Sequence, residues 1–221
     1  MMLFYSLMYF TASNISALDR ITRLNLINSI TGIKPANLIG SQSNAGDTNL
    51  AVFSSVVHLG SNPALLGFIL RPQGEVRRHT YENIMETGVY TINAVSNNLA
   101  KQAHYTSAKF PAELCEFEKS GLTKEYIAGF TAPFVSESPI KIGLKFLEEI
   151  AIKANNTQLI VGEVQHLIIP SPSQDLDGHL NLESLQLTGI SGLNSYYKLT
   201  KIAQYPYVRE HFSVDDLENI A

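Results

Sequence analysis

The sequence offers little sulfur chemistry, because its 221 residues include a single cysteine, Cys115. One cysteine excludes an intrachain disulfide framework and fits a reducing compartment such as the cytoplasm. A catalytic thiol stays open as an alternative, although a lone cysteine is more often inert than reactive. We therefore expect a cytoplasmic protein in which Cys115 has no catalytic role.

Charge is also scarce, since charged residues make up 16% of the chain and the formal net charge is −4. A mildly acidic chain without an extended basic face is not expected to have nucleic acid as its main partner. Hydrophobic residues make up 45% of the chain, which is enough for a full core. We expect one domain over residues 1–221, because all-β barrels of that size are ordinary.

The sequence motifs of several enzyme classes are missing. The six histidines are scattered, and none is spaced from another as metal ligands are, so we expect no metal site. There is no G-x-S-x-G, P-loop or G-x-G-x-x-G motif, so nothing local supports a hydrolase or a dinucleotide-binding fold.

Apolar runs of membrane-spanning length are missing too. Residues 1–10 are apolar and aromatic, but they are too short to cross a bilayer and lack the basic segment of a secretory signal. We expect residues 1–19 to form an arm that covers a hydrophobic surface, with a true start at Met8 as an alternative. The polar residues 208–221 are expected to form a peripheral tail.

What the sequence does contain is a series of strand patterns separated by turn residues. Alternating or continuous apolar runs predict strands at residues 35–43, 48–59, 64–70, 89–95, 140–152 and 158–169. Residues 44–47 predict the turn between the first two strands. The alternation in the fifth strand breaks at residues 147–149, where a bulge would restore it.

The remaining segments give weaker signals. Helices are predicted at residues 13–18 and 97–108, while residues 20–30 are ambiguous. Residues 110–139 read as an excursion with short helices, residues 180–187 as a short helix or turn, and residues 189–198 as a flexible closing segment. Together these patterns predict one compact, strand-rich domain with a few helices.

A basic cluster follows the third predicted strand. Arg71, Arg77 and Arg78 fall within eight positions, although the chain has only 16 lysines and arginines. Thr80 stands where the N-cap of a helix over residues 81–87 is expected, and Gly88 is suited to end that helix.

A helix start combined with arginine side chains is a suitable place for an anion. Free backbone N–H groups and the positive end of the helix dipole attract anions, and arginine can bind phosphate with two hydrogen bonds. Taken by themselves, the residues leave two readings open: a phosphate site, or a solvated basic loop beside a capped helix.

The order of several short motifs resembles the flavin reductase-like family, flavoredoxin-like proteins that have the FMN-binding split-barrel fold. The family pattern is a G-x-x-N-x-A-x-x-S run, a basic-x-Thr helix start, then N-I before a T-G stop. Its counterparts here are the residues 46–54, 78–80, 83–84 and 87–88, with later matches at residues 137–139, 161–164, 177–180, 192 and 196. The resemblance covers roughly residues 35–197.

The resemblance implies a mainly β fold, an open antiparallel Greek-key barrel with peripheral helices. It also implies a homodimer with FMN near the subunit interface. The residues that match the segment along the isoalloxazine and ribityl chain are Asn49, Leu50, Ala51, Ser54 and Ser55. Leu70 and Arg71 match the strand end facing the flavin, and the phosphate-binding helix start is matched by Arg78, His79, Thr80 and Asn83.

The function that the resemblance implies is oxidoreduction, in which NADH or NADPH passes hydride to FMN and electrons move onward. Since the flavin carries the chemistry, we assign no catalytic acid or base. His58 lies near the flavin-binding strand in sequence, and a structural role is its simpler interpretation. Two alternatives stay open: a flavin carrier or sensor without efficient turnover, and a purely structural β-barrel.

Overall fold

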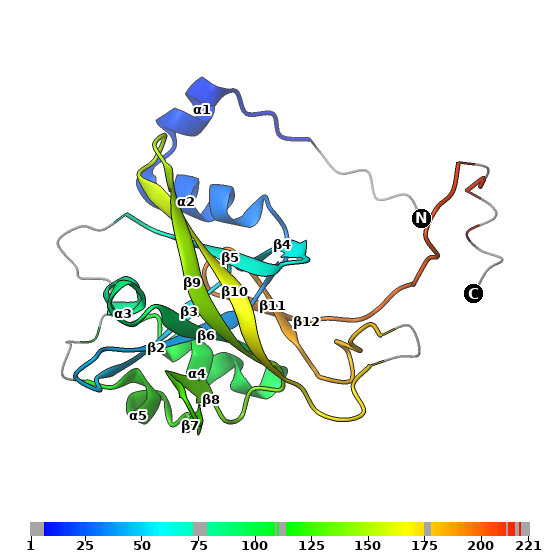
Figure 1. The fold of residues 1–221 in the computed structure, drawn as a ribbon. Coiled ribbons are helices and arrows are strands. Elements are labelled where there is room, and N and C mark those ends of the chain that lie inside the picture. The colour runs from blue at the N-terminus through cyan, green and yellow to red at the C-terminus, as the bar shows by residue number, and fades with distance from the viewer. Residues whose placement is uncertain are drawn as a thin grey trace.

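The structure, a computed structural model, describes residues 7–72, 79–108, 110, 114–174, 178–210, 212–214 and 217. Its centre is a seven-stranded antiparallel sheet with the order β3-β2-β6-β9-β10-β5-β4 (Figure 1). The strands are β2 (Asn37–Gln42), β3 (Thr48–Phe53), β4 (Val57–Ser61), β5 (Ala64–Leu70), β6 (Val89–Ala94), β9 (Lys141–Ile152) and β10 (Thr157–Ile168).

The two ends of this order, β3 and β4, do not pair with each other, so the barrel is open. Two small sheets accompany it: β7 (Lys124–Ile127) with β8 (Phe130–Val135), and β1 (Lys34–Pro35) with β11 (Thr188–Ser191) and β12 (Ser195–Lys198). The helices are α1 (Ala12–Ala17), α2 (Arg20–Ser29), α3 (His79–Thr87), the 3-10 helix η1 (Asn97–Leu99), α4 (Ala100–Tyr105) and α5 (Glu116–Ser120). The predicted fold class, a mainly β open barrel with peripheral helices, is confirmed.

The hairpin of β2 and β3 is buried on both faces. Neighbouring side chains on a strand point to opposite faces. Leu38 and Leu50 accordingly pack in one core cluster with Phe117 of α5, whereas Ile39 packs in a second cluster with Ile84 of α3. The hairpin therefore lies between α5 and α3, as the arrangement in Figure 1 also shows.

The predicted strand over residues 48–59 was wrong in one respect, because it is two strands, β3 and β4, separated by residues 54–56. The break is explained by a contact of Ser55 with a neighbouring strand. Its hydroxyl donates to the carbonyl oxygen of Ile69 at 3.1 Å and accepts the N–H of Ile69 at 3.1 Å, so it binds the backbone of β5. β4 then pairs with β5 and forms the opposite edge of the sheet.

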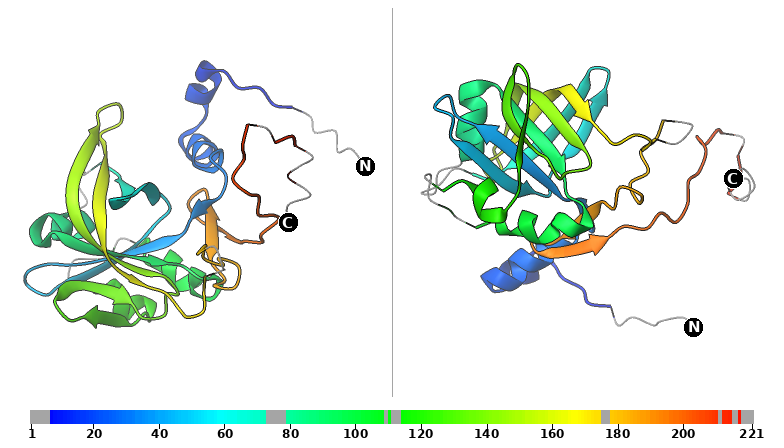
Figure 2. Two further views of the ribbon diagram at one scale, coloured as in Figure 1. Left: turned by 45° about the vertical axis from the view of Figure 1, so that its right-hand side comes forward. Right: turned by 90° about the horizontal axis from the view of Figure 1, so that it is seen from below.

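The long strands β9 and β10 form a hairpin that projects beyond the other strands (Figure 2). The predicted bulge is confirmed, because Val161 pairs with Glu148 while the next residue, Gly162, pairs with Phe146. One residue of β9 is thereby left unpaired. A side chain at position 162 would overlap the hydroxyl of the buried Tyr90, so this close approach requires glycine.

Helix α3 differs from the prediction at its start and agrees with it at its end. Its first described residue is His79, so Thr80 lies inside the helix and the prediction of an N-cap at Thr80 was wrong. The buried Thr80 hydroxyl accepts a hydrogen bond from a side chain of β3. Gly88 has a φ of +72° and its N–H donates to the carbonyl of Ile84 at 2.9 Å, which confirms the predicted helix stop.

The closing segment over residues 189–198 is ordered, which corrects the expectation of flexibility. Residues 188–191 and 195–198 pair as β11 and β12, and β11 also pairs with β1. The Thr188 N–H donates to the carbonyl of Val95, which ties this small sheet to the end of β6. Residues 182–186 are turns, one of the two predicted alternatives.

Helices α1 and α2 lie outside the barrel. Both views of Figure 2 show them, and the segment after β12, outside the seven-stranded sheet. Neither helix contains a buried residue, and each is held locally: Thr11 forms a capping box with Asn14, and Asp19 caps α2. Within the described ranges, no helix is both long and apolar enough to cross a membrane.

Candidate functional site

The first turn of α3 is fixed to the β2–β3 hairpin by two side-chain hydrogen bonds. The Asn49 amide of β3 donates to the Thr80 hydroxyl at 2.8 Å, and one turn later the Asn83 amide donates to the Ser41 hydroxyl of β2 at 3.2 Å. All four residues are buried. Three residues predicted for the site from distant motifs, Asn49, Thr80 and Asn83, therefore meet at one place.

The break after β3 and the end of β5 lie beside each other. Ser55 binds the backbone of Ile69, directly before Leu70 and Arg71. The Leu70 side chain is buried in the core, whereas Arg71 is exposed at the exit of the strand. Arg77 and Arg78 of the predicted basic cluster fall outside the described residues.

The accessible side chains of this region differ from the buried ones that join β3 to α3. Ala51, Ser54 and His79 are half-buried and Arg71 is exposed, while the Leu50 side chain is part of the core. The first turn of α3 contains the imidazole of His79, and the guanidinium of Arg71 lies eight positions earlier in sequence. The N-terminal end of a helix carries the positive end of the helix dipole. This donor set is chemically suited to an anion such as a phosphate.

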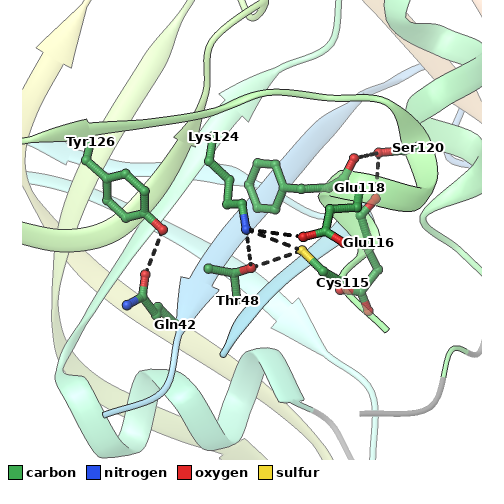
Figure 3. Close-up of polar contacts among 9 residues, drawn as sticks. Gln42, Thr48, Cys115, Glu116, Glu118, Ser120, Lys124 and Tyr126 are labelled. Atoms are coloured by element: carbon green, nitrogen blue, oxygen red, sulfur yellow. Dashed lines mark hydrogen bonds and ion pairs between the residues drawn. The ribbon is translucent and has the colours of Figure 1, made fainter. Parts of the chain in front are cut away.

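The outer edge of β3 carries a second cluster, which the sequence analysis missed. The Leu50 N–H donates to Oε2 of Glu116 at 3.3 Å, and the Thr48 hydroxyl lies 3.1 Å from Sγ of Cys115. Figure 3 shows the ammonium of Lys124 directed at this group, with Nζ 3.4 Å from the Thr48 hydroxyl and 3.7 Å from the Cys115 sulfur.

Glu116 is buried, with 8% of its surface exposed, and burial raises the pKa of its carboxyl. Its hydrogen bond from Leu50 and the nearby His79 act in the opposite direction and lower that pKa. No signal in the sequence links Glu116 to the site, because 66 residues separate it from Leu50. The sequence likewise identifies the adjacent Cys115 only as a single cysteine and gives no indication of its contact with Thr48.

Other candidate groups do not assemble into a site. His58, which was weighed for its position in sequence, contacts the Ser61 hydroxyl at 3.2 Å on the exposed strand β4. In the part of the chain that the structure describes, no cluster of three or more histidine, cysteine, aspartate or glutamate side chains could hold a metal ion.

The open antiparallel sheet described above is similar to that of a solved protein with a split-barrel domain. A model of the flavin reductase-like domain matches residues 33–181. The chain belongs to the flavin reductase-like family, as its motifs indicated.

Solved structures and a curated relative are similar to this chain over most of its length. A split-barrel protein of Shewanella frigidimarina NCIMB 400, assigned as a flavin reductase, is 45% identical, with a TM-score of 0.87 over 91% of this chain and 100% of that one. Flavoredoxin of Desulfovibrio vulgaris (Miyazaki F), 22% identical over 83% of this chain and 93% of its own, shares the fold with a TM-score of 0.67. A protein of Aquifex aeolicus (strain VF5) is 26% identical over 81% of this chain and 90% of its own.

Proposed function

We propose that this protein is an FMN-dependent oxidoreductase that accepts hydride from NADH or NADPH and passes electrons onward. The observation that carries the proposal is the Asn49 to Thr80 contact, which joins β3 to the first turn of α3 in a chain of the flavin reductase-like family. Ser55, directly after β3, also binds the end of β5 at Ile69. Bound FMN supplies the redox chemistry, and the protein supplies binding and orientation.

The chain's own residues divide into two groups in this proposal. The isoalloxazine and ribityl chain lie along Asn49, Leu50, Ala51, Ser54 and Ser55, with Leu70 and Arg71 at the strand end. The phosphate lies at the helix start with Arg78, His79, Thr80 and Asn83. The buried leucines offer a ligand only their backbone, whereas His79 and Arg71 offer charge and hydrogen-bond donors.

A titration with FMN, FAD and riboflavin tests the phosphate part of the proposal. Arg78→Ala should weaken FMN roughly tenfold to 150-fold, because a hydrogen bond to a charged group is lost, and should leave riboflavin nearly unchanged. Raised salt should weaken FMN binding to the wild type more than to the variant. Equal affinity of the wild type for FMN and riboflavin would remove the phosphate site.

Turnover separates an enzyme from a flavin carrier or sensor. The purified protein is mixed with FMN and with NADH or NADPH, and oxidation of the nicotinamide is followed by its absorbance. Steady turnover that requires the protein supports the oxidoreductase. Tight flavin binding without turnover would favour the carrier, and no flavin binding would favour a structural barrel.

The assembly that we propose is a cytoplasmic homodimer of single-domain subunits. Support comes from apolar side chains that the isolated chain leaves in solvent, among them Leu7, Met8 and Tyr9 of the arm and Ile202 near the other end. The single cysteine is in keeping with the compartment. Light scattering that finds a stable monomer at micromolar concentration would contradict the dimer.

A further inference from the structure

The outer edge of β3 presents backbone groups that the sheet cannot satisfy. Among the described strands, β3 stands at the end of the sheet with β2 as its neighbour, so alternate N–H groups point away from the sheet. Leu50 is one of these positions, and it is fully buried. A buried N–H without an acceptor would cost free energy, so this position needs a partner from outside the sheet.

Glu116 at the start of α5 is that partner. Its Oε2 accepts the Leu50 N–H at 3.3 Å, and the preceding residue, Cys115, contacts Thr48 two positions along the same strand. From the opposite side, Thr80 of α3 binds the Asn49 amide. Three consecutive residues of β3 are thus held by three different groups, two from α5 and its N-cap and one from α3.

We propose that Glu116 is a positioning residue of the flavin site, whose carboxylate holds the outer edge of β3 so that Asn49 and Ala51 keep their place beside α3. The inference rests on the proposed function, because that function requires the β3 segment to bind a flavin. Glu116 acts through the backbone of β3 and does not touch the ligand.

A carboxylate suits this role better than a neutral acceptor. Hydrogen bonds to an ionised acceptor are roughly twice as strong as neutral ones, and a buried bond is less weakened by water. Lys124 of β7 lies 4.0 Å from the carboxylate of Glu118, and both residues are drawn beside Glu116 in Figure 3. His79 of α3 also interacts electrostatically with this carboxylate.

Hydrogen exchange of the Leu50 amide in the flavin-free protein tests the contact by itself. Glu116→Ala should speed this exchange by about tenfold or more, and Glu116→Gln by about threefold, because its amide oxygen is a neutral acceptor. Glu118→Gln is the matched control, since that side chain lies on the same helix, is 74% exposed and should change nothing. Exchange at the wild-type rate in Glu116→Gln or Glu116→Ala would overturn the proposal.

Flavin affinity tests the consequence. FMN should bind Glu116→Ala about tenfold more weakly than wild type and Glu116→Gln about threefold more weakly, with Glu118→Gln unchanged. If Glu116→Ala does not fold, the test is made with Glu116→Gln alone. Wild-type FMN affinity of Glu116→Gln, together with faster exchange of its Leu50 amide, would contradict the positioning role. If the wild type binds no flavin, the proposed function fails, whereas the exchange results report on the Leu50 contact independently.

Discussion

The β2–β3 hairpin and the pair of helices α1 and α2 are stabilised in opposite ways. The hairpin has little local stabilisation beyond its turn, yet it is held on one face by α3 and at its edge by α5 through contacts 31 and 66 residues apart in sequence. α1 and α2 have well-formed caps and no buried residue. Local capping thus accounts for α1 and α2, which bury no side chain. Contacts between distant residues account for the β2–β3 hairpin, the region that is suited to bind a ligand.

The difference has a physical basis. A capped helix of 6 or 10 residues is marginal in water, because nucleating a helix is costly and few hydrogen bonds follow. Hydrogen bonds from Thr22 hold the pKa of the Asp19 carboxyl below its usual value, as expected for a carboxylate that caps a helix. The caps set where the helices begin, but burial of an apolar face would have to supply most of their stability.

The largest expected effect on stability comes from truncating an isoleucine that is packed in the core. The matching isoleucine in α2 is considered last. Ile84→Ala, in α3, removes a fully buried side chain from the core and should lower the free energy of unfolding by about 3 kcal/mol. The measurement is urea denaturation followed by circular dichroism. A loss below about 1 kcal/mol would mean that α3 is not packed on the barrel as described.

A smaller effect is expected where α3 is tied to β3. Thr80→Ala leaves the buried Asn49 amide without its acceptor and should cost about 2 kcal/mol of stability, and we also expect weaker FMN binding. Thr80→Ser keeps the hydroxyl and is the matched control. Equal melting temperatures for the Ala and Ser variants would show that the hydroxyl contact contributes nothing.

The pH dependence of stability should report on Glu116. Burial raises the pKa of the Glu116 carboxyl above the usual 4.5. The folded protein therefore binds a proton at this carboxyl more tightly than the unfolded chain does. The stabilising contribution is complete below that usual value and is lost as pH rises through the raised pKa. Glu116→Gln should lack this component, so its stability relative to wild type should increase as pH rises across that window, measured by urea denaturation at several pH values.

The smallest effect on folding is expected in α2. Ile21 is 59% exposed, and Ile21→Ala should change the free energy of unfolding of the isolated chain by no more than about 0.5 kcal/mol. If α2 packs on a second subunit, the same change should shift the association equilibrium towards monomer. Light scattering at several protein concentrations measures this, and an unchanged equilibrium would remove Ile21 from the interface.

Much of the fold could be predicted from patterns of a few residues. The strand at residues 64–70 has the predicted bounds, and those at 89–95, 140–152 and 158–169 agree within one residue at each end. The glycine turn at Gly46, with a φ of +96°, and the stop at Gly88 were also predicted correctly. Each of these depends on local backbone geometry or on alternation along one strand, which the sequence contains directly.

The errors occurred where a distant partner decided the outcome. The break at residues 54–56 depends on the bond from Ser55 to Ile69, and residues 189–198 are ordered because they pair with a strand near residue 35. The start of α3 differs from the predicted cap. Residues 20–30, which were ambiguous by pattern, are a different case, because a local cap at Asp19 marks the start of a helix there.

By itself, the sequence determined the strand-rich class, the positions of the main strands and turns, and the family, because alternation, glycine placement and motif order are properties of neighbouring residues. Only the tertiary structure decided that Asn49 meets Thr80 and that Glu116 satisfies the edge of β3. Such pairings arise because buried polar groups must find partners wherever the packed chain brings an acceptor within reach, at whatever separation in sequence.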